Sequence, residues 1–208
     1  MINVIAVVDY GAGNLQSVKK ALDFIGAPCI ITKNADEIKK ADKVILPGVG
    51  SFGDAMDSMH KSGLTDAVKE AALSGKPFLG ICLGLHLLFE ESEESPGAKG
   101  LGILKGKIRK IPLEEGIKVP HMGWNSLEVK QHDGVFASTK DGDYVYFVHS
   151  YYLTADNPEE VAARTVYGST VIDAAVKKGN LCAVQFHPEK SGSVGLNMLR
   201  NFAGMEAL

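Results

Sequence analysis

A cysteine flanked by two glycines constrains the fold of this chain most. Residues 77–81 form a short apolar run that leads into the pentapeptide Gly-Ile-Cys-Leu-Gly at 80–84. This spacing is typical of the sharp turn by which a strand delivers a nucleophile to the start of a helix. The free N–H groups and the dipole at such a helix start favour a thiolate. We predict that Cys82 is a nucleophile and that the N–H of Leu83 stabilises an oxyanion, although a lone cysteine would more often be a core residue.

Composition narrows the class of protein. The length of 208 residues and an apolar share of 45% suit a single α/β domain spanning residues 1–208. A net charge of −3 offers no positive surface for nucleic acid. No basic leader precedes the first apolar run, and no run approaches the roughly 20 residues that span a membrane. Three cysteines without metal-type spacing predict a reducing, cytoplasmic compartment, with no metal and no cofactor.

Strand and helix patterns alternate through the first half of the chain. Near-continuous apolar runs predict buried parallel strands, and apolar residues three and four positions apart predict the helices between them. The expected strands cover residues 2–9, 28–32, 43–46 and 77–81, and the expected helices cover 15–25, 34–40, 64–73 and 83–91. Residues 47–53 are expected to form a glycine-rich loop. This order predicts an open, mostly parallel sheet flanked by helices.

The second half of the chain has a different residue pattern. Short alternating segments separated by turn signals predict antiparallel strands added to the sheet. These segments are 107–111, 126–129, 144–152, 162–166, 171–176 and 181–186. A closing helix at 194–202 should turn Leu199 and Phe202 inward. The predicted fold class is therefore α/β, with helices around a mostly parallel sheet that carries added antiparallel strands.

A candidate base for Cys82 follows one of these strands. The apolar run at 181–186 leads straight into His187, Pro188 and Glu189. Side chains two residues apart in extended chain point the same way, so Glu189 can hold one imidazole nitrogen while the other faces the cysteine. A cysteine nucleophile needs a base, and the base needs an orienting acid. His-Pro-Glu alone would more often be a surface turn, but beside the cysteine motif it predicts a catalytic triad.

The glycine-rich loop at 47–53 admits more than one interpretation. Its glycines match the dinucleotide-binding pattern, but the next strand ends in Cys82 instead of the required acidic residue. Asp54 stands where a phosphate-binding loop needs lysine. Because the carboxyl ends of parallel strands converge at one edge, the N–H groups around Val49 and Gly50 are expected to complete an oxyanion hole. A plain glycine-rich turn is the alternative.

Together these motifs resemble the class I glutamine amidotransferase family over nearly the whole chain. The general marks are Pro47-Gly48-x-Gly50, Gly80-x-Cys82-x-Gly84 and His187-Pro188-Glu189. Further marks resemble the glutaminase subunits of imidazole glycerol phosphate synthases: Asp-Tyr-Gly-Ala-Gly-Asn at 9–14, Pro-His-Met-Gly-Trp-Asn at 120–125, Phe-Val-His-Ser-Tyr at 147–151 and His-Pro-Glu-Lys-Ser at 187–191.

The resemblance implies a glutaminase reaction. Cys82 attacks the side-chain amide of glutamine, and His187 protonates the departing ammonia and then activates water. The N–H groups of Leu83 and Val49 stabilise the tetrahedral intermediates. The implied substrate contacts are Gly50, His86, Glu94, Ser150 and Tyr151. Glu94 would bind the α-ammonium of glutamine, because a negatively charged carboxylate attracts a positively charged ammonium group.

The resemblance also implies a partner. Ammonia would pass to a separate (β/α)8-barrel cyclase subunit in a heterodimer, which makes imidazole glycerol phosphate and an aminoimidazole carboxamide ribotide in histidine biosynthesis. The implied contacts are Asn14, Trp124, Tyr146 and Lys190. Trp124 is the only tryptophan, in a Gly-Trp-Asn segment that we expect to be a turn, and tryptophan is enriched at interfaces. We expect the free subunit to hydrolyse glutamine slowly and the liganded partner to accelerate it.

One residue departs from the family pattern. His86 stands where the family usually has a glutamine that binds the substrate. Imidazole cannot copy the geometry of an amide, and it ordinarily titrates near neutrality. We therefore expect glutamine binding to weaken below a pH of about 6.5, unless His86 points away from the substrate.

Two other functions stay open. The chain can be the glutaminase subunit of another pathway, such as pyridoxal phosphate or anthranilate synthesis, but the Gly-Trp-Asn segment and Lys190-Ser191 argue against it. It can also be a catalytically silent domain of the same fold that binds a partner or senses redox state. The intact set of Cys82, His187 and Glu189 argues against silence.

Overall fold

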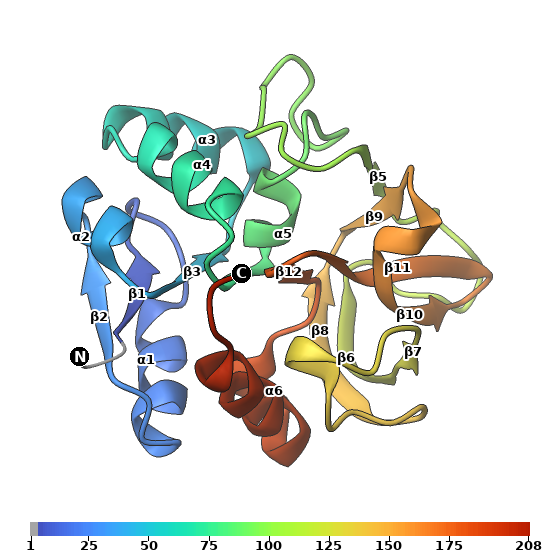
Figure 1. The fold of residues 1–208 in the computed structure, drawn as a ribbon. Helices are drawn as coiled ribbons and strands as arrows, with labels where there is room; N and C mark the ends of the chain where they lie inside the picture. Colours follow the sequence, from blue (N-terminus) through green and yellow to red (C-terminus); the bar gives the residue numbers. More distant parts are fainter. Residues whose placement is uncertain (1–3) are drawn as a thin grey trace.

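An eight-stranded mixed sheet runs through the centre of the computed structural model, which describes residues 4–208 (Figure 1). The strand order is β2-β1-β3-β4-β12-β11-β10-β7. The first five strands in this order are parallel to one another, and the pairs from β12 to β7 are antiparallel. Its strands are β1 (Ile5–Val8), β2 (Cys29–Thr32), β3 (Lys43–Gly48), β4 (Phe78–Cys82), β7 (Glu128–Val129), β10 (Val161–Tyr167), β11 (Thr170–Lys178) and β12 (Leu181–Val184). This architecture confirms the predicted fold class.

Helices cover both faces of the parallel part of the sheet (Figure 1). They are α1 (Leu15–Phe24), α2 (Ala35–Lys40), α3 (Phe52–Lys61), α4 (Thr65–Leu73), α5 (Leu83–Leu87) and α6 (Gly192–Gly204). Side chains alternate along β1, so Ile5 and Val7 pack with α1 and α6, whereas Ala6 and Val8 pack with α2 to α5. Burial of β1 on both faces explains its unbroken apolar sequence.

Local signals explain several helix boundaries. Asn34 caps α2, since its side chain accepts from the N–H of Asp36 at 2.8 Å. Helix α3 is not among the predicted helices, because the glycines at 47–53 favour a loop and the next predicted helix begins at residue 64. Ser51 caps α3 and accepts from the N–H of Asp54 at 3.3 Å. The expected helix at 83–91 is shorter, because α5 ends at Leu87 and the following chain folds back, with the N–H of Ile103 bonded to the carbonyl of Leu88.

The second half of the chain contains two further small sheets. Strand β5 (Gly106–Lys110) pairs with β9 (Tyr151–Ala155), and β6 (His121–Ser126) pairs with β8 (Tyr144–His149), both antiparallel. The prediction that the segments at 107–111 and 144–152 join the main sheet is therefore wrong, because they form β5, β8 and β9 in the small sheets, and β6 is a strand that was not predicted. The expected strand at 144–152 breaks at Ser150 into β8 and β9, and the expected strand at 126–129 is replaced by β6 and β7, with Leu127 between them.

The strand that leads to His187 also differs from expectation. The alternating pattern predicts an antiparallel strand at residues 181–186, but β12 runs parallel to β4, with Val184 opposite Ile81. It is antiparallel only to β11. The parallel pairing brings the carboxyl ends of β4 and β12 to the same edge of the sheet, which is the edge where Cys82 and His187 follow.

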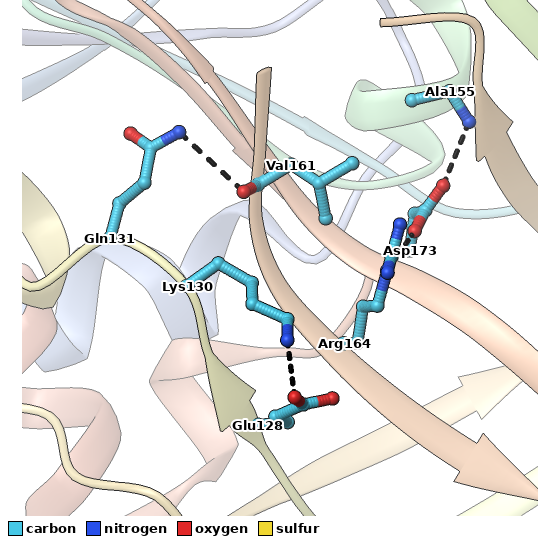
Figure 2. Close-up of polar contacts among 7 residues, drawn as sticks. All are labelled: Glu128, Lys130, Gln131, Ala155, Val161, Arg164 and Asp173. Carbon is cyan, nitrogen blue, oxygen red and sulfur yellow. Dashed lines mark hydrogen bonds and ion pairs between the residues drawn. The ribbon is translucent and has the colours of Figure 1, made fainter. Parts of the chain in front are cut away.

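Polar contacts stabilise the antiparallel edge of the sheet, which is formed by β11, β10 and β7. Figure 2 shows Asp173 of β11 held from two sides, by Arg164 Nε at 2.8 Å and by the N–H of Ala155 at 2.9 Å. The side chain of Gln131 donates to the carbonyl of Val161 at 3.5 Å, and Lys130 pairs with Glu128 (Figure 2). The buried carboxylate of Asp173 is thus paired and hydrogen-bonded, as a buried charge requires.

The remaining boundaries agree with the sequence-based expectations within a few residues. The expected closing helix corresponds to α6, and both Leu199 and Phe202 are fully buried. The first expected strand began at residue 2, but residues 1–3 lie outside the described part of the chain. Three short 3-10 turns complete the elements: η1 (Gly134–Phe136), η2 (Pro158–Glu160) and η3 (Pro188–Lys190).

Two properties of residues 4–208 bear on function. Each helix there is too short or too polar to cross a membrane. The same residues contain no group of three or more histidine, cysteine, aspartate or glutamate side chains placed to hold a metal ion.

Candidate active site

Cys82 occupies a strained turn between β4 and α5. Its φ of 55° makes it the one non-glycine residue with positive φ among residues 4–208. A non-glycine residue in this region carries strain that the surrounding structure must hold, and such strain often marks a functional site. The side chain is 8% exposed, and its sulfur lies 3.9 Å from the carbonyl oxygen of Val148. The turn thus presents the sulfur at the carboxyl edge of the sheet.

The glycines around Cys82 allow β3, β4 and α5 to approach closely. A Cβ on Gly84 would lie 1.9 Å from the carbonyl oxygen of Leu46, a distance at which the backbone of β3 must move. A Cβ on Gly80 would meet the carbonyl oxygen of Gly84 at 3.0 Å. Space therefore requires glycine at position 84 and favours it at position 80, where a side chain would be tightly packed; positive φ is not the reason, since neither is among the left-handed glycines.

His187 and Glu189 form a buried pair beside this turn. Nδ1 of His187 lies 2.8 Å from Oε1 of Glu189, and the two side chains are 2% and 1% exposed. Burial alone would lower the pKa of His187, but its contacts with Cys82 and Glu189 outweigh burial and raise the pKa to about 9. The imidazole therefore favours the protonated form, which suits a cation next to a thiolate.

The backbone fixes the position of His187 through a serine. Ser191 Oγ donates to the carbonyl of His187 at 2.6 Å and accepts from the N–H of Tyr146 at 3.0 Å. The N–H of His187 in turn donates to the carbonyl of Tyr146 at 3.0 Å. These bonds tie η3 to β8, so the histidine is held from two elements.

A cavity of about 240 Å3 opens over Cys82. The expected site residues that line it are Val49, Gly50, Cys82, Leu83, His86, Glu94, Ser150, Tyr151 and His187, and it is also lined by Val148, His149 and Lys190. Glu189 lies behind His187 and does not line the cavity. A larger groove of about 600 Å3 runs beside β5 between Glu90 and Asp156, but neither Cys82 nor His187 lines it.

The loop after β3 lies directly beside Cys82. Gly48 is paired with Cys82 in the parallel register of β3 and β4, so Val49 and Gly50 follow at the same edge. Gly50 has a φ of 96°, a conformation that favours glycine, and Val49 is 41% exposed. The assignment of the Val49 and Leu83 N–H groups as an oxyanion hole stays a prediction, supported by this proximity.

Glu94 reaches the cavity from the acidic loop. Its Oε2 accepts from the N–H of Phe52 at 2.9 Å, at the start of α3. Burial raises the pKa of Glu94, and the bond from Phe52 opposes the shift. The helix start therefore orients this carboxylate, which is the arrangement that an ammonium-binding role needs.

His86 lies on α5, against the floor of the cavity, and is 4% exposed. Its Nε2 is 2.7 Å from Oε1 of Gln185, and its Nδ1 has no hydrogen-bond partner among the described residues. Burial lowers the pKa of His86 to about 4, although the bond to Gln185 acts in the opposite direction. The expectation that His86 titrates near pH 6.5 is therefore wrong, because the buried imidazole stays neutral there. Its contact with glutamine stays a prediction.

His149, which lines the cavity, is paired with His121 behind it. His121 Nδ1 is 3.0 Å from His149 Nε2, His149 Nδ1 is 2.9 Å from the carbonyl oxygen of Tyr151, and Asn125 Nδ2 is 3.4 Å from His121 Nε2. Burial lowers the pKa of His121 to about 4 and that of His149 to about 3, so both are neutral. The carbonyl accepts only, so His149 must carry its proton on Nδ1, His121 must donate from Nδ1, and Asn125 must donate to His121.

The expected partner contacts lie outside the cavity, except Lys190. Trp124 is 55% exposed and packs edge-on against Tyr146, with ring centroids 6.1 Å apart. The segment around Trp124 is strand β6 and not the expected turn, so its side chain points outward by strand alternation. Asn14 precedes α1 without a side-chain cap. Contact of these residues with a partner stays a prediction.

Sequence reasoning missed four residues of this site: Gln185, Val148, His149 and His121. Gln185 precedes His187 by two residues, so the rule that paired His187 with Glu189 also places Gln185 on the same side. His149 lies in the segment at 147–151, which was quoted for the family but given no role. No spacing in the sequence connects His121 to His149, because their contact depends on the pairing of β6 with β8.

The site combines two features of an open α/β sheet. A sharp turn after one strand presents a cysteine, and a histidine follows the neighbouring parallel strand. This combination defines a known class of proteins. The model of the family described as glutamine amidotransferase class-I matches residues 6–205. The chain belongs to this family, and the resemblance read from its motifs is confirmed.

More specific relatives carry the name imidazole glycerol phosphate synthase subunit HisH. The relative from Oceanobacillus iheyensis is 47% identical over 202 residues, which are 97% of this chain and 99% of the relative. That from Trichormus variabilis is 50% identical over 200 residues, which are 96% of this chain and 94% of the relative.

Solved structures share the fold. A crystal structure described as a glutamine amidotransferase has a TM-score of 0.74 and 21% identity, over 97% of this chain and 99% of its own. The structure of PurLQS from Thermotoga maritima has a TM-score of 0.76 and 21% identity, over 97% of this chain and 98% of its own.

Proposed function

We propose that this chain is the glutaminase subunit of an imidazole glycerol phosphate synthase, acting in the cytoplasm in histidine biosynthesis. Family membership and the name shared by relatives at 47–50% identity over nearly the full length support the pathway. The observation that carries the chemistry is the placement of the Cys82 sulfur in a strained turn next to the buried pair of His187 and Glu189. Residues 1–208 act in this proposal as one glutaminase domain.

The proposed reaction runs through a thioester. The Cys82 thiolate attacks the side-chain amide carbon of glutamine, and the negative oxygen is stabilised by the N–H groups of Leu83 and Val49. Protonated His187 gives its proton to the departing nitrogen, which leaves as ammonia. Neutral His187 then takes a proton from water, the resulting hydroxide attacks the thioester, and glutamate leaves while Cys82 returns to the thiolate.

Substrate recognition in this proposal uses the walls of the cavity. Glu94 accepts the α-ammonium of glutamine, while the chain around Ser150 and Tyr151 faces the opposite end of the substrate. A cavity of about 240 Å3 suits a single amino acid and excludes a large acyl group. His86 is neutral at working pH and can offer only the lone pair of Nδ1.

The proposed partner is a cyclase subunit with a (β/α)8 barrel, bound as a heterodimer that takes the ammonia. Trp124 supplies exposed aromatic surface and packs against the half-buried Tyr146 beside η3, and Lys190 lines the cavity. Aromatic residues are enriched at interfaces, and a cation at the rim can pair with an acidic partner side chain. Asn14 is the fourth proposed contact.

The test measures glutamate and ammonia release with and without a histidine-pathway cyclase carrying its ligand. We expect slow release by the free chain, acceleration by the cyclase, and a loss of at least about 10³-fold in Cys82→Ala, because removal of a nucleophile costs this much or more. Cys29→Ala is the matched control, since Cys29 lies on β2 away from the cavity, and it should keep full activity.

The possible outcomes separate the competing functions. Activity that needs Cys82 but ignores the cyclase would assign the chain to another glutaminase pathway, such as pyridoxal phosphate or anthranilate synthesis. Release that is unchanged in Cys82→Ala would contradict the thioester mechanism. Absence of release under every condition would favour a silent binding domain.

A further inference from the structure

Gln185 is a fully buried polar residue that the proposed mechanism leaves unused. It directly follows β12, and its backbone N–H donates to the carbonyl of Ala174 at 2.8 Å. Its side chain touches two members of the site: Oε1 is 2.7 Å from His86 Nε2, and Nε2 is 3.9 Å from Cys82 Sγ. A buried amide that joins a neutral imidazole to a nucleophilic sulfur calls for an explanation beyond packing.

The protonation state of His86 fixes the direction of these contacts. His86 is buried and neutral, so it carries one ring proton. Placing that proton on Nδ1 would leave a buried donor without a partner, because Nδ1 makes no hydrogen bond among the described residues. The proton therefore lies on Nε2 and is donated to Oε1 of Gln185. The amide NH2 of Gln185 then faces Cys82, and the sulfur receives a donor.

The arrangement mirrors the other side of the cysteine. Glu189 holds His187 through Nδ1 at 2.8 Å, and His86 holds Gln185 through Oε1 at 2.7 Å. Gln185 and His187 stand two residues apart and both act on the same sulfur: the Gln185 amide lies 3.9 Å from it, and the interaction with Cys82 helps to raise the pKa of His187. The buried Tyr10 hydroxyl is also affected by Cys82: burial, and to a lesser extent the charge of the cysteine, raise the pKa of Tyr10.

We propose that Gln185 is a positioning residue that donates a hydrogen bond to the Cys82 thiolate and is oriented for this by His86. The inference rests on the proposed role of Cys82 as nucleophile. The Gln185 bond stabilises the thiolate and restrains the sulfur, so that it points at the substrate carbon. The proposal also gives a role to His86, which replaces the glutamine usual in the family. The histidine supplies a fixed donor to Gln185 whether or not it touches the substrate.

The test measures the rate at which iodoacetamide alkylates Cys82 as a function of pH, read by mass spectrometry of the peptide that contains Cys82. The full chain is used without substrate. Gln185→Met keeps the length of the side chain and removes the donor. Loss of a hydrogen bond to a charged group should move the pH midpoint of alkylation up by about one unit, or lower the rate about tenfold at a fixed pH below it.

Variants at position 86 make the test independent of simple damage to the fold. His86→Phe removes the donor that orients Gln185 and should raise the midpoint by a similar amount. His86→Gln restores an amide donor and should keep the midpoint near that of the wild type. Gln131→Met is the control at a half-exposed surface glutamine that lies far from the cavity and should change nothing.

An unchanged midpoint in folded Gln185→Met, verified by its circular dichroism spectrum, would overturn the proposal. Equal behaviour of His86→Gln and His86→Phe would contradict the orienting role of His86. Neither result depends on glutamine turnover, so failure here is distinct from failure of the proposed function, for which Cys82→Ala is the test. In turnover assays Gln185→Met should lower kcat with KM for glutamine nearly unchanged, because the residue acts through the sulfur.

Discussion

At the scale of single residues, Gly84 shows how tightly the nucleophile turn is built. Replacing Gly84 by alanine would put a Cβ 1.9 Å from the carbonyl oxygen of Leu46, in a backbone that cannot rotate away. We expect Gly84→Ala to lower the free energy of unfolding by about 3 kcal/mol or more, since overpacking of a rigid interior costs this order of energy. Urea denaturation followed by circular dichroism measures the change.

Gly204 provides the matched control for that substitution. It ends α6, and a Cβ there would have no heavy atom within 4 Å. Gly204→Ala should leave the stability unchanged or raise it by up to about 1 kcal/mol, because alanine favours the helix. If Gly84→Ala unfolded at the same urea concentration as the wild type, the close approach of α5 to β3 would not be required.

At the scale of elements, the sequence predicts those helices and strands whose pattern lies within a few neighbouring residues. An unbroken apolar run predicts a buried parallel strand, so the bounds of β1 to β4 agree with the prediction within a few residues. Helix α3 was missed although Phe52, Ala55, Met56 and Met59 follow a helical spacing, because the glycines before them favoured a loop. The break at Ser150 and the parallel direction of β12 depend on contacts between distant segments, which no local pattern records.

The candidate site follows the same division. Cys82, His187 and Glu189 lie in short motifs whose chemistry can be read from neighbours in the sequence. The environment of His86 could not be read, because its burial depends on the packing of α5 against β12. The pairing of β6 with β8 likewise creates the contact between His121 and His149. Motifs thus reveal reactive groups, while the groups that set their protonation come from the tertiary structure.

The histidine pair between β6 and β8 supports a stability prediction at this scale. His121 donates to His149 at 3.0 Å and stacks on Phe147 and Tyr167 at centroid distances of 4.7 and 3.9 Å. His121→Phe keeps the stacking but leaves Nε2 of His149 as a buried acceptor without a partner. We expect the free energy of unfolding to fall by about 1–3 kcal/mol, measured by urea denaturation at pH 7.

An exposed histidine controls for the loss of imidazole itself. His60 lies near the end of α3 on the surface, and His60→Phe should change the stability by no more than about 0.5 kcal/mol. Equal stabilities of His121→Phe and the wild type would mean that the hydrogen-bond chain from Asn125 to Tyr151 contributes nothing measurable. It would then hold the cavity wall only by packing.

At the scale of the whole molecule, buried neutral histidines around one cavity make the fold sensitive to acid. The folded pKa of His86 is lowered to about 4 and that of His149 to about 3, whereas an unfolded histidine titrates near 6.5. Below pH 6.5 the unfolded chain therefore binds protons that the folded chain does not. The stability that these two histidines contribute is full above pH 6.5 and falls as the pH drops towards 4, by up to about 1.4 kcal/mol per pH unit for each histidine.

This acid limb can be separated from the titration of other groups. His187 has a pKa raised to about 9, so its contribution to stability grows as the pH falls from 9 to about 6 and is nearly constant below that. It therefore opposes the acid loss between pH 7 and 6, but equally in the wild type and in His86→Gln. Urea denaturation at pH 7, 6 and 5 should show a steep loss of stability in the wild type and a shallower loss in His86→Gln, because one proton uptake is removed. Parallel slopes for the two proteins would show that His86 is not held neutral by burial. A shallower slope would place the acid sensitivity of the whole fold at the floor of its candidate active site, where burial of His86 maintains both the fold and the orientation of Gln185 towards Cys82.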